Sequence, residues 1–165
     1  MLKEEFNEIA NSIINTEIFQ QLKYEVHHGT TRYDHSMRVA WTAFCWAKKL
    51  GLDYKSATRA ALFHDLFRKK DCKGLTKKEI NRVHPLLAVK NAQEHFGINE
   101  IEKDAIINHM YPLTPNKPTS KEGRLLGYAD KFVAINEGIK YNNPLAHASQ
   151  KLSRTYSMLA IVNSN

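Results

Sequence analysis

Apolar residues recur every three or four positions along most of the chain, and prolines and glycines fall between these stretches. This spacing puts the apolar side chains on one face of a helix, and no stretch shows the strict alternation typical of a strand. The pattern predicts helices over residues 2–15, from there to about 25, and over 35–50, 54–67, 84–96, about 99–110, 120–137 and 145–161. The expected fold is an all-α bundle.

Residues that cap helices, or stop them, lie at the expected helix ends. The capping candidates are Asp34, Asp53, the pair Asn99 and Glu102, and the pair Thr119 and Glu122, and the stops are Gly51 and Gly97. Pro85 fits the first turn of the helix 84–96, because a first turn needs no backbone N–H donor.

The length of 165 residues predicts one domain with a sizeable core. Cys45 and Cys72 are too few for a disulfide framework or a thiolate zinc site. No apolar run approaches the roughly 20 residues of a membrane span, and the N-terminus has the pattern of an amphipathic helix. We therefore expect a cytoplasmic protein that does not contact a membrane.

The charge is basic, with 24 lysines and arginines against 17 aspartates and glutamates and a formal net charge of +7. Such an excess favours anionic partners such as phosphates. We expect the basic residues to be evenly spread along the chain, and an even spread predicts no dedicated surface for nucleic acid.

Six ionisable residues inside the expected helices share the apolar face of their helix. His35, for example, is in step with Val39 and Ala43. Each residue alone fits a hydrogen-bonded core histidine or a solvated aspartate, but six together could not be buried without mutual desolvation and repulsion. A divalent metal ion would turn that cost into binding. The six residues are His35, His64, Asp65, His84, His109 and Asp130.

The order of these residues, with the dipeptide HD at 64–65, resembles the HD superfamily of metal-dependent phosphohydrolases, and small single-domain bacterial members in particular. The segments TRYDHSMRVA, HPLLA and YADKF are similar as well, and the resemblance covers about residues 27–138. It implies a single HD domain over residues 1–165 with a metal site in its core. Residues 1–26 would form N-terminal helices, and residues 139–165 a C-terminal helix or tail.

The resemblance also implies how the six residues divide. A first divalent ion would be bound by His35, His64, Asp65 and Asp130. In two-metal members Asp65 bridges to a second ion, which His84 and His109 would hold here, whereas in other members the corresponding histidines contact phosphate. The number of ions is thus one or two, and the metal is open among Fe, Mn, Co, Ni and Zn, since all accept nitrogen and oxygen ligands.

Two residues are catalytic candidates. Asp65 could hold a metal-bound water for attack, and Arg68, three residues later, could bind a phosphate or the leaving group with a forked pair of N–H donors. Arg32 and Lys131 are, with Arg68, the substrate-binding candidates. Each of the three cations also fits a plain surface position.

The chemistry implied is hydrolysis of a phosphoester or phosphoanhydride by metal-activated water. The expected substrate is a small phosphorylated molecule, a nucleotide or dinucleotide, and no specific nucleic-acid binding is expected. Two alternatives stay open: a di-iron oxygenase on the same fold, and a non-catalytic module that binds metal or nucleotide. The exact substrate and the oligomeric state are open as well.

Overall fold

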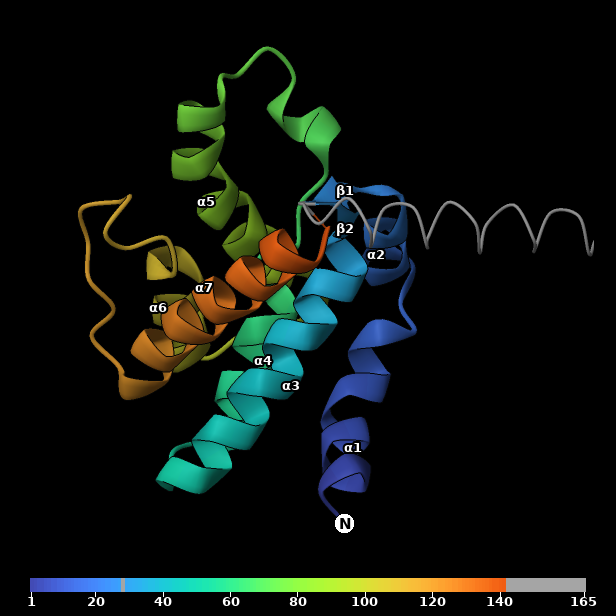
Figure 1. Ribbon diagram of the computed structural model, residues 1–165, viewed down its shortest axis with the longest axis vertical. Coiled ribbons are helices and arrows are strands. Elements are labelled where there is room, and N and C mark those ends of the chain that lie inside the picture. Colours follow the sequence, from blue (N-terminus) through green and yellow to red (C-terminus); the bar gives the residue numbers. More distant parts are fainter. Residues whose placement is uncertain (28, 142–165) are drawn as a thin grey trace, which may run out of the picture.

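Helices dominate the computed structural model, which describes residues 1–27 and 29–141 (Figure 1). The α-helices are α1 (Leu2–Ile14), α2 (Glu17–Gln20), α3 (Arg32–Leu50), α4 (Tyr54–Phe63), α5 (Lys77–Phe96), α6 (Glu100–Asn108) and α7 (Lys121–Tyr141). The 3-10 helices are η1 (Gln21–Tyr24) and η2 (Lys69–Cys72), and the strands are β1 (Val26–His27) and β2 (Thr30–Thr31). The all-α prediction is confirmed, although the small hairpin, in which β1 and β2 pair in antiparallel fashion, was not predicted.

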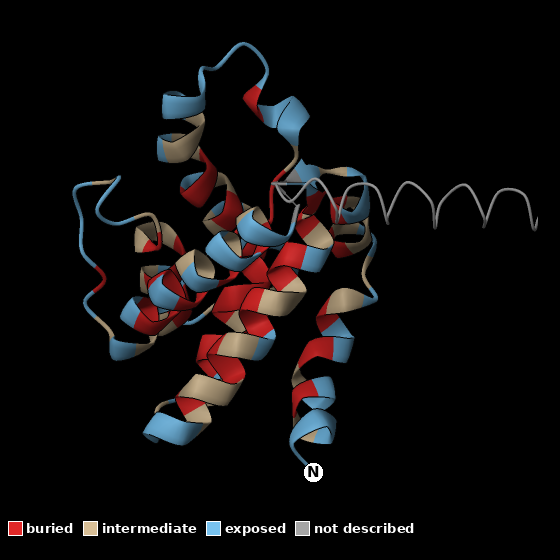
Figure 2. Cartoon of the chain, viewed as in Figure 1, coloured by how far each residue is buried: buried red, intermediate tan, exposed pale blue. Residues whose placement is uncertain are grey.

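Helices α3 and α4 lie side by side at the centre, and α7 packs against both (Figure 1). Helix α6 contacts α4, α5 and α7, whereas α1 packs on α4 from the other side. Close approach of these helices is possible because α4 presents small side chains at Ala57, Ala60 and Ala61, all fully buried. Buried residues gather where α3, α4 and α7 meet (Figure 2). The core therefore surrounds the end of α4 that carries the HD dipeptide.

Several predicted helix ends are confirmed. The Asp53 side chain accepts hydrogen bonds from the backbone N–H groups of Lys55 and Ser56 at the start of α4. Gly51 ends α3 with a φ of 64°, a left-handed conformation that favours glycine. The capping box of Asn99 and Glu102 opens α6 as expected.

The predicted start of α3 and the predicted end of α4 were wrong. Helix α3 begins three residues earlier than predicted, because Thr31, rather than Asp34, accepts the capping hydrogen bond, from the Asp34 backbone N–H. Helix α4 ends at Phe63, before the predicted limit of residue 67, with His64 as its C-terminal cap.

The starts of α5 and α7 also differ from the prediction. Helix α5 begins at Lys77, so Pro85 lies inside the helix and not in its first turn. At the start of α7 the predicted Thr119 and Glu122 box is not formed. The Ser120 hydroxyl accepts from Gly123 N–H, and the Glu122 carboxylate instead accepts from Asp53 N–H.

Among the described residues, no helix is long and apolar enough to cross a membrane. The predicted helix 145–161 lies outside the described residues. The division into a core of about 27–138 with flanking segments stays a prediction.

Candidate metal centre

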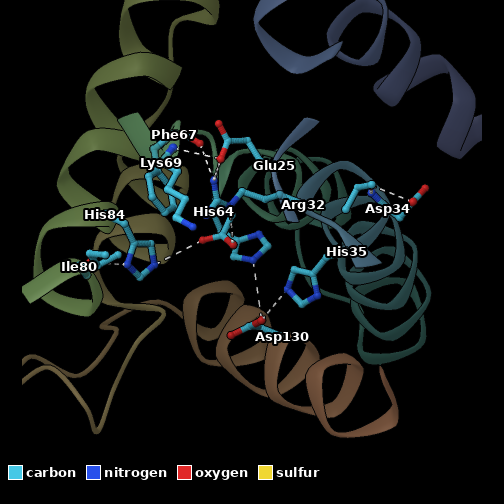
Figure 3. A network of polar contacts seen from close by, with 12 residues as sticks. Glu25, Arg32, Asp34, His35, His64, Phe67, Lys69, Ile80, His84 and Asp130 are labelled. Atoms are coloured by element: carbon cyan, nitrogen blue, oxygen red, sulfur yellow. Dashed lines mark hydrogen bonds and ion pairs between the residues drawn. The ribbon is translucent and has the colours of Figure 1, made fainter. Parts of the chain in front are cut away.

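Five helices bring the six predicted ligands together at one place in the core. His35 lies in the first turn of α3, and His64 and Asp65 follow the last turn of α4. His84 lies in the middle of α5 and His109 directly after α6. Asp130 lies on α7 and faces His35 and His64 (Figure 3). The four histidines and Asp65 are at most 5% exposed, so water solvates none of them well.

The six side chains form two clusters, each with its nitrogen and oxygen atoms within 4.8 Å of one another. The first cluster is His35, His64 and Asp130, and the second cluster is Asp65, His84 and His109. In the first cluster the Nε2 of His35 is 3.0 Å from Asp130 Oδ1. In the second cluster His84 Nε2 is 3.1 Å from His109 Nε2 and 3.4 Å from Asp65 Oδ1. Both donor sets, imidazole nitrogen and carboxylate oxygen, suit a divalent transition metal.

The other ring nitrogen of every histidine points at an oxygen outside the clusters. The Nδ1–oxygen pairs are His35 with Glu137 Oε2 at 2.9 Å, His64 with the Ala61 carbonyl at 2.7 Å, His84 with the Ile80 carbonyl at 2.9 Å and His109 with the Ile106 carbonyl at 2.7 Å. A carbonyl oxygen can only accept, so Nδ1 carries the proton in the last three. Metal-binding histidines commonly have this arrangement, in which Nδ1–H is held and Nε2 is free to bind.

Two observations follow from these tautomers. In neutral His84 and His109 the Nε2 atoms both carry lone pairs, and these face one another at 3.1 Å with no proton between them. The Nε2 of His64 is buried and makes no hydrogen bond with any described residue, with Asp130 Oδ1 3.8 Å away. Facing lone pairs and a buried, unsatisfied acceptor both destabilise the protein unless a cation is bound there. The residues therefore fit a metal ion in each cluster.

His35 of the first cluster and the two histidines of the second cluster are held in opposite protonation states. Burial lowers the pKa of His35, but hydrogen bonds to Asp130 and Glu137 outweigh it and raise that pKa to about 10. The same contact with His35 lowers the pKa of Asp130, against the effect of burial. Burial lowers the pKa of His84, and burial followed by the nearby His64 and His84 lowers that of His109 to about 3. The first cluster is thus a charged pair and the second a pair of neutral rings.

Glu137 is a functional candidate that the sequence analysis missed. It is 3% exposed, and its carboxylate contacts both His35 and Arg38, the latter at 2.5 Å from Nη1. Its contact with His35 crosses 102 positions of sequence, so no local pattern reveals it. A signal did exist, because Glu137 lies seven residues after Asp130 and so shares its helix face.

Gly127 sets how closely α7 approaches the end of α6. A Cβ atom at this position would lie 3.3 Å from the His109 carbonyl oxygen, tighter than an ordinary contact. The same carbonyl receives Lys131 Nζ at 3.4 Å, and Nζ also donates to the Gly127 carbonyl at 3.1 Å. Lys131, a predicted substrate-binding residue, therefore lies beside the second cluster.

The other two predicted cations differ in placement. Arg32 is 7% exposed, its guanidinium lies 3.8 Å from the centre of the Phe67 ring, and its Nη1 donates to the Phe67 carbonyl. Its Nε is 3.5 Å from Asp65 Oδ2, which places Arg32 behind that ligand as a support. Arg68 is half-exposed and lies near Asp71 and Gln21, apart from both clusters. Their substrate-binding roles stay predictions.

The basic charge is concentrated next to the second cluster. Residues 68–82 hold seven of the 24 lysines and arginines but only two of the 17 aspartates and glutamates, a net +5 out of +7. The expectation of an even spread was therefore wrong. This basic segment starts three residues after Asp65 and ends two residues before His84. It runs over η2 and the start of α5, at the top of Figure 1.

Comparison with known proteins agrees with this geometry. The family model "HD domain" matches residues 32–135, more than half of the chain. The chain belongs to the HD domain family, a superfamily of metal-dependent phosphohydrolases whose domains bind divalent metals.

Curated relatives are similar at low identity. Ribonuclease Y of Geobacter sulfurreducens is 29% identical over 120 residues, 73% of this chain and 21% of that protein. A deoxyguanosinetriphosphate triphosphohydrolase-like protein of Caldanaerobacter subterraneus subsp. tengcongensis is 25% identical over 157 residues, 84% of this chain and 45% of that protein. Ribonuclease Y of Pseudothermotoga lettingae is 30% identical over 121 residues, 73% of this chain and 22% of that protein. The chain spans less than half the length of each.

Proposed function

We propose that the chain is one HD domain that hydrolyses a phosphoester or phosphoanhydride bond with a two-metal centre. The observation that carries the proposal is the second cluster, where two buried imidazoles face one another through unprotonated Nε2 atoms at 3.1 Å. A binding site for one ion alone would need only the first cluster and Asp65. The facing pair supports a second ion.

Each cluster would hold one divalent ion, with His35, His64 and Asp130 on one and His84 and His109 on the other. Asp65 lies in the chain directly after His64 and reaches His84 at 3.4 Å, a position suited to a carboxylate shared by both ions. When bound, such ions lower the pKa of a water molecule and offset the charge that develops on phosphoryl oxygens.

The protein's own residues would orient the centre and exclude water from it. Fixed Nδ1 contacts hold each ring in one orientation, and Arg32 holds Asp65 from behind. Because the histidines are at most 5% exposed, their contacts lie in a poorly solvated environment where electrostatic interactions are strong. The proposed phosphate contacts are Lys131, beside the second cluster, and Arg68, at the start of the basic segment.

The substrate that we propose is a nucleotide or dinucleotide. Its anionic phosphates would be attracted by the basic segment 68–82, and the similarity to a triphosphohydrolase-like protein supports a nucleotide. A second candidate is a phosphodiester bond in RNA. The net +5 of the basic segment and the ribonuclease Y relatives favour it.

The test is hydrolysis by the full chain, loaded with manganese, iron or cobalt, in the absence of oxygen, with the nucleotide and phosphate products separated by chromatography. Nucleoside triphosphates, dinucleotides and a short single-stranded RNA are compared. Turnover of a nucleotide or dinucleotide supports the first candidate, and RNA cleavage alone supports the second. Oxygen consumption without anaerobic hydrolysis would instead support the oxygenase alternative, and nucleotide binding without turnover the binding module.

A further inference from the structure

Helix α7 exposes a continuous stripe of large apolar side chains to solvent. Tyr128, Phe132, Ile135 and Ile139 follow one another at intervals of four, three and four residues, and each is between 52% and 69% exposed. Single exposed apolar residues are ordinary, but a helix face of this kind is typical of an interface.

Two open hollows lie along this stripe, between α7 and α3. The first has a volume of about 490 Å³ and is lined by Trp41, Phe132 and Lys140, among others. The second has a volume of about 540 Å³ and is lined by Trp46, Tyr128 and Lys121, among others. They adjoin one another, because the rings of Trp46 and Phe132 are 5.4 Å apart. We call this continuous surface the α3/α7 trough.

One end of the trough lies at the last turn of α7, where the described part of the chain ends. Its first hollow reaches Lys140, in the last turn of α7, and its second reaches Lys121 at the other end of the helix. The two lysines are nineteen helical positions apart, so the trough is about 28 Å long.

The chain that follows α7 has a matching pattern. Residues 142–165 lie outside the described part of the structure, and the pattern is one of their sequence. Apolar residues recur there every three or four positions: Leu145, Ala148, Leu152, Tyr156, Leu159 and Val162. On a helix these six share one face, and Gln150 and Ser157 lie on the other. From Leu145 to Val162 such a helix is about 26 Å long, close to the length of the trough.

We propose that residues 145–162 fold back as an amphipathic helix and dock in the α3/α7 trough, antiparallel to α7. Residues 142–144, "NNP", provide a three-residue connection, within the usual length for a helix hairpin. The docked helix covers the α7 stripe and both tryptophans. It also covers two residues that line the first hollow, Glu137, which contacts His35, and Arg38, which donates to Glu137, so docking shields the support of the first cluster from water.

The two tryptophans of the chain make the test direct, because each lines one hollow. The full chain is compared with a variant carrying Leu152→Asp and Leu159→Asp, by tryptophan emission and by acrylamide quenching. Docking predicts that the variant emits at longer wavelength and is quenched more strongly. The matched control, Gln150→Asp with Ser157→Asp, adds the same charge to the other face and leaves both signals unchanged.

A second variant changes the exposed stripe of α7 that the docked helix would cover. Ile135→Asp with Ile139→Asp alters two exposed residues, so the fold is retained, and the same spectral shift is expected. Identical spectra for all variants and the unaltered chain would overturn the proposal. A signal that depends on protein concentration, together with a two-chain mass by light scattering, would also overturn it and assign the trough to a second copy.

Hydrogen exchange on the unaltered chain gives a measurement that needs no variant. Docking predicts protected amides across residues 145–162 in the monomer. Exchange of these amides at the rate of an unstructured peptide contradicts the proposal.

Discussion

The two clusters of the metal centre use the same residue types but differ in how a proton can replace a metal ion. In the first cluster protonated His35 donates Nε2–H to Asp130 and Nδ1–H to Glu137, so these carboxylates balance its positive charge without metal. In the second cluster His84 and His109 face one another as neutral rings, and burial opposes protonation of either. The second cluster, rather than the first, therefore points most directly to a bound cation.

Asp65→Asn is expected to have the largest effect, because Asp65 is the only proposed ligand that both ions would share. Metal ions contribute several kcal/mol to stabilising charge in the transition state, so the activity should fall about a thousandfold or more. The measurement is kcat/KM for the best phosphorylated substrate. Glu100→Gln, an exposed carboxylate of α6, is the control and should leave kcat/KM unchanged. Retention of activity by Asp65→Asn would remove Asp65 from the centre.

Substitutions in one cluster should remove one ion and leave the other. His109→Gln replaces an imidazole of the second cluster, and Asp130→Asn a carboxylate of the first. Elemental analysis should show each variant losing about one metal atom per chain relative to the unaltered protein. Loss of both atoms from either variant would mean that the clusters form a single cooperative site.

Glu137→Gln separates the clusters through a residue that contacts His35 but no other proposed ligand. Loss of an outer carboxylate partner typically lowers metal affinity by about 10- to 100-fold, and the effect should be confined to one of the two ions in a metal titration, the ion of the first cluster. Glu102→Gln is a matched control, since Glu102 is also buried and paired with an arginine, Arg59 at 2.6 Å, but contacts no ligand. Equal effects of the two variants on metal affinity would show that Glu137 has only a structural role.

In metal-free protein, stability should fall on the alkaline side because of His35 and on the acid side in part because of His109. His35 has its pKa raised from 6.5 to about 10, so its contribution is complete below pH 6.5 and is lost as the pH rises through 10. His109 has its pKa lowered to about 3, so its contribution is complete above pH 6.5 and is lost as the pH falls through 3. Urea unfolding of chelator-treated protein measures both limbs. His35→Gln should flatten the alkaline limb and His109→Gln the acid limb.

Much of the centre could be predicted because each predicted ligand interrupts an apolar helical stripe. His35 is in step with Val39 and Ala43, so the period of the helix alone placed it inside. The pairing of Asp65 with His84 and His109 could not be derived in this way, because it depends on how α4, α5 and α6 pack. There only the resemblance to a family supplied the grouping.

The start of α5 is marked in the sequence by a capping box, but the prediction gave more weight to Pro85. Thr76 and Glu79 form a capping box in the structure and can be recognised in the sequence "TKKE". The prediction instead placed Pro85 in the first turn of the helix, which therefore began at residue 84. A proline inside a helix is costly because it lacks an N–H group, and here the helix is continuous through it. Packing of His84 and Ala88 in the core outweighs that local preference.

The basic segment was missed for a different reason. Its seven cations are plain in the sequence, but an average over the whole chain hides a net +5 within residues 68–82. Its importance depends on position, because both of its ends adjoin ligands of the second cluster. Only the fold shows that Asp65 and His84, which flank the segment, lie 3.4 Å apart.

The most direct test of the two-metal centre is a count of metal atoms per chain in protein purified without chelator and then reconstituted with manganese, iron or cobalt. The two clusters predict about two transition-metal atoms per chain. A count of one would contradict the two-metal centre, and a count of zero after reconstitution would contradict the metal centre altogether.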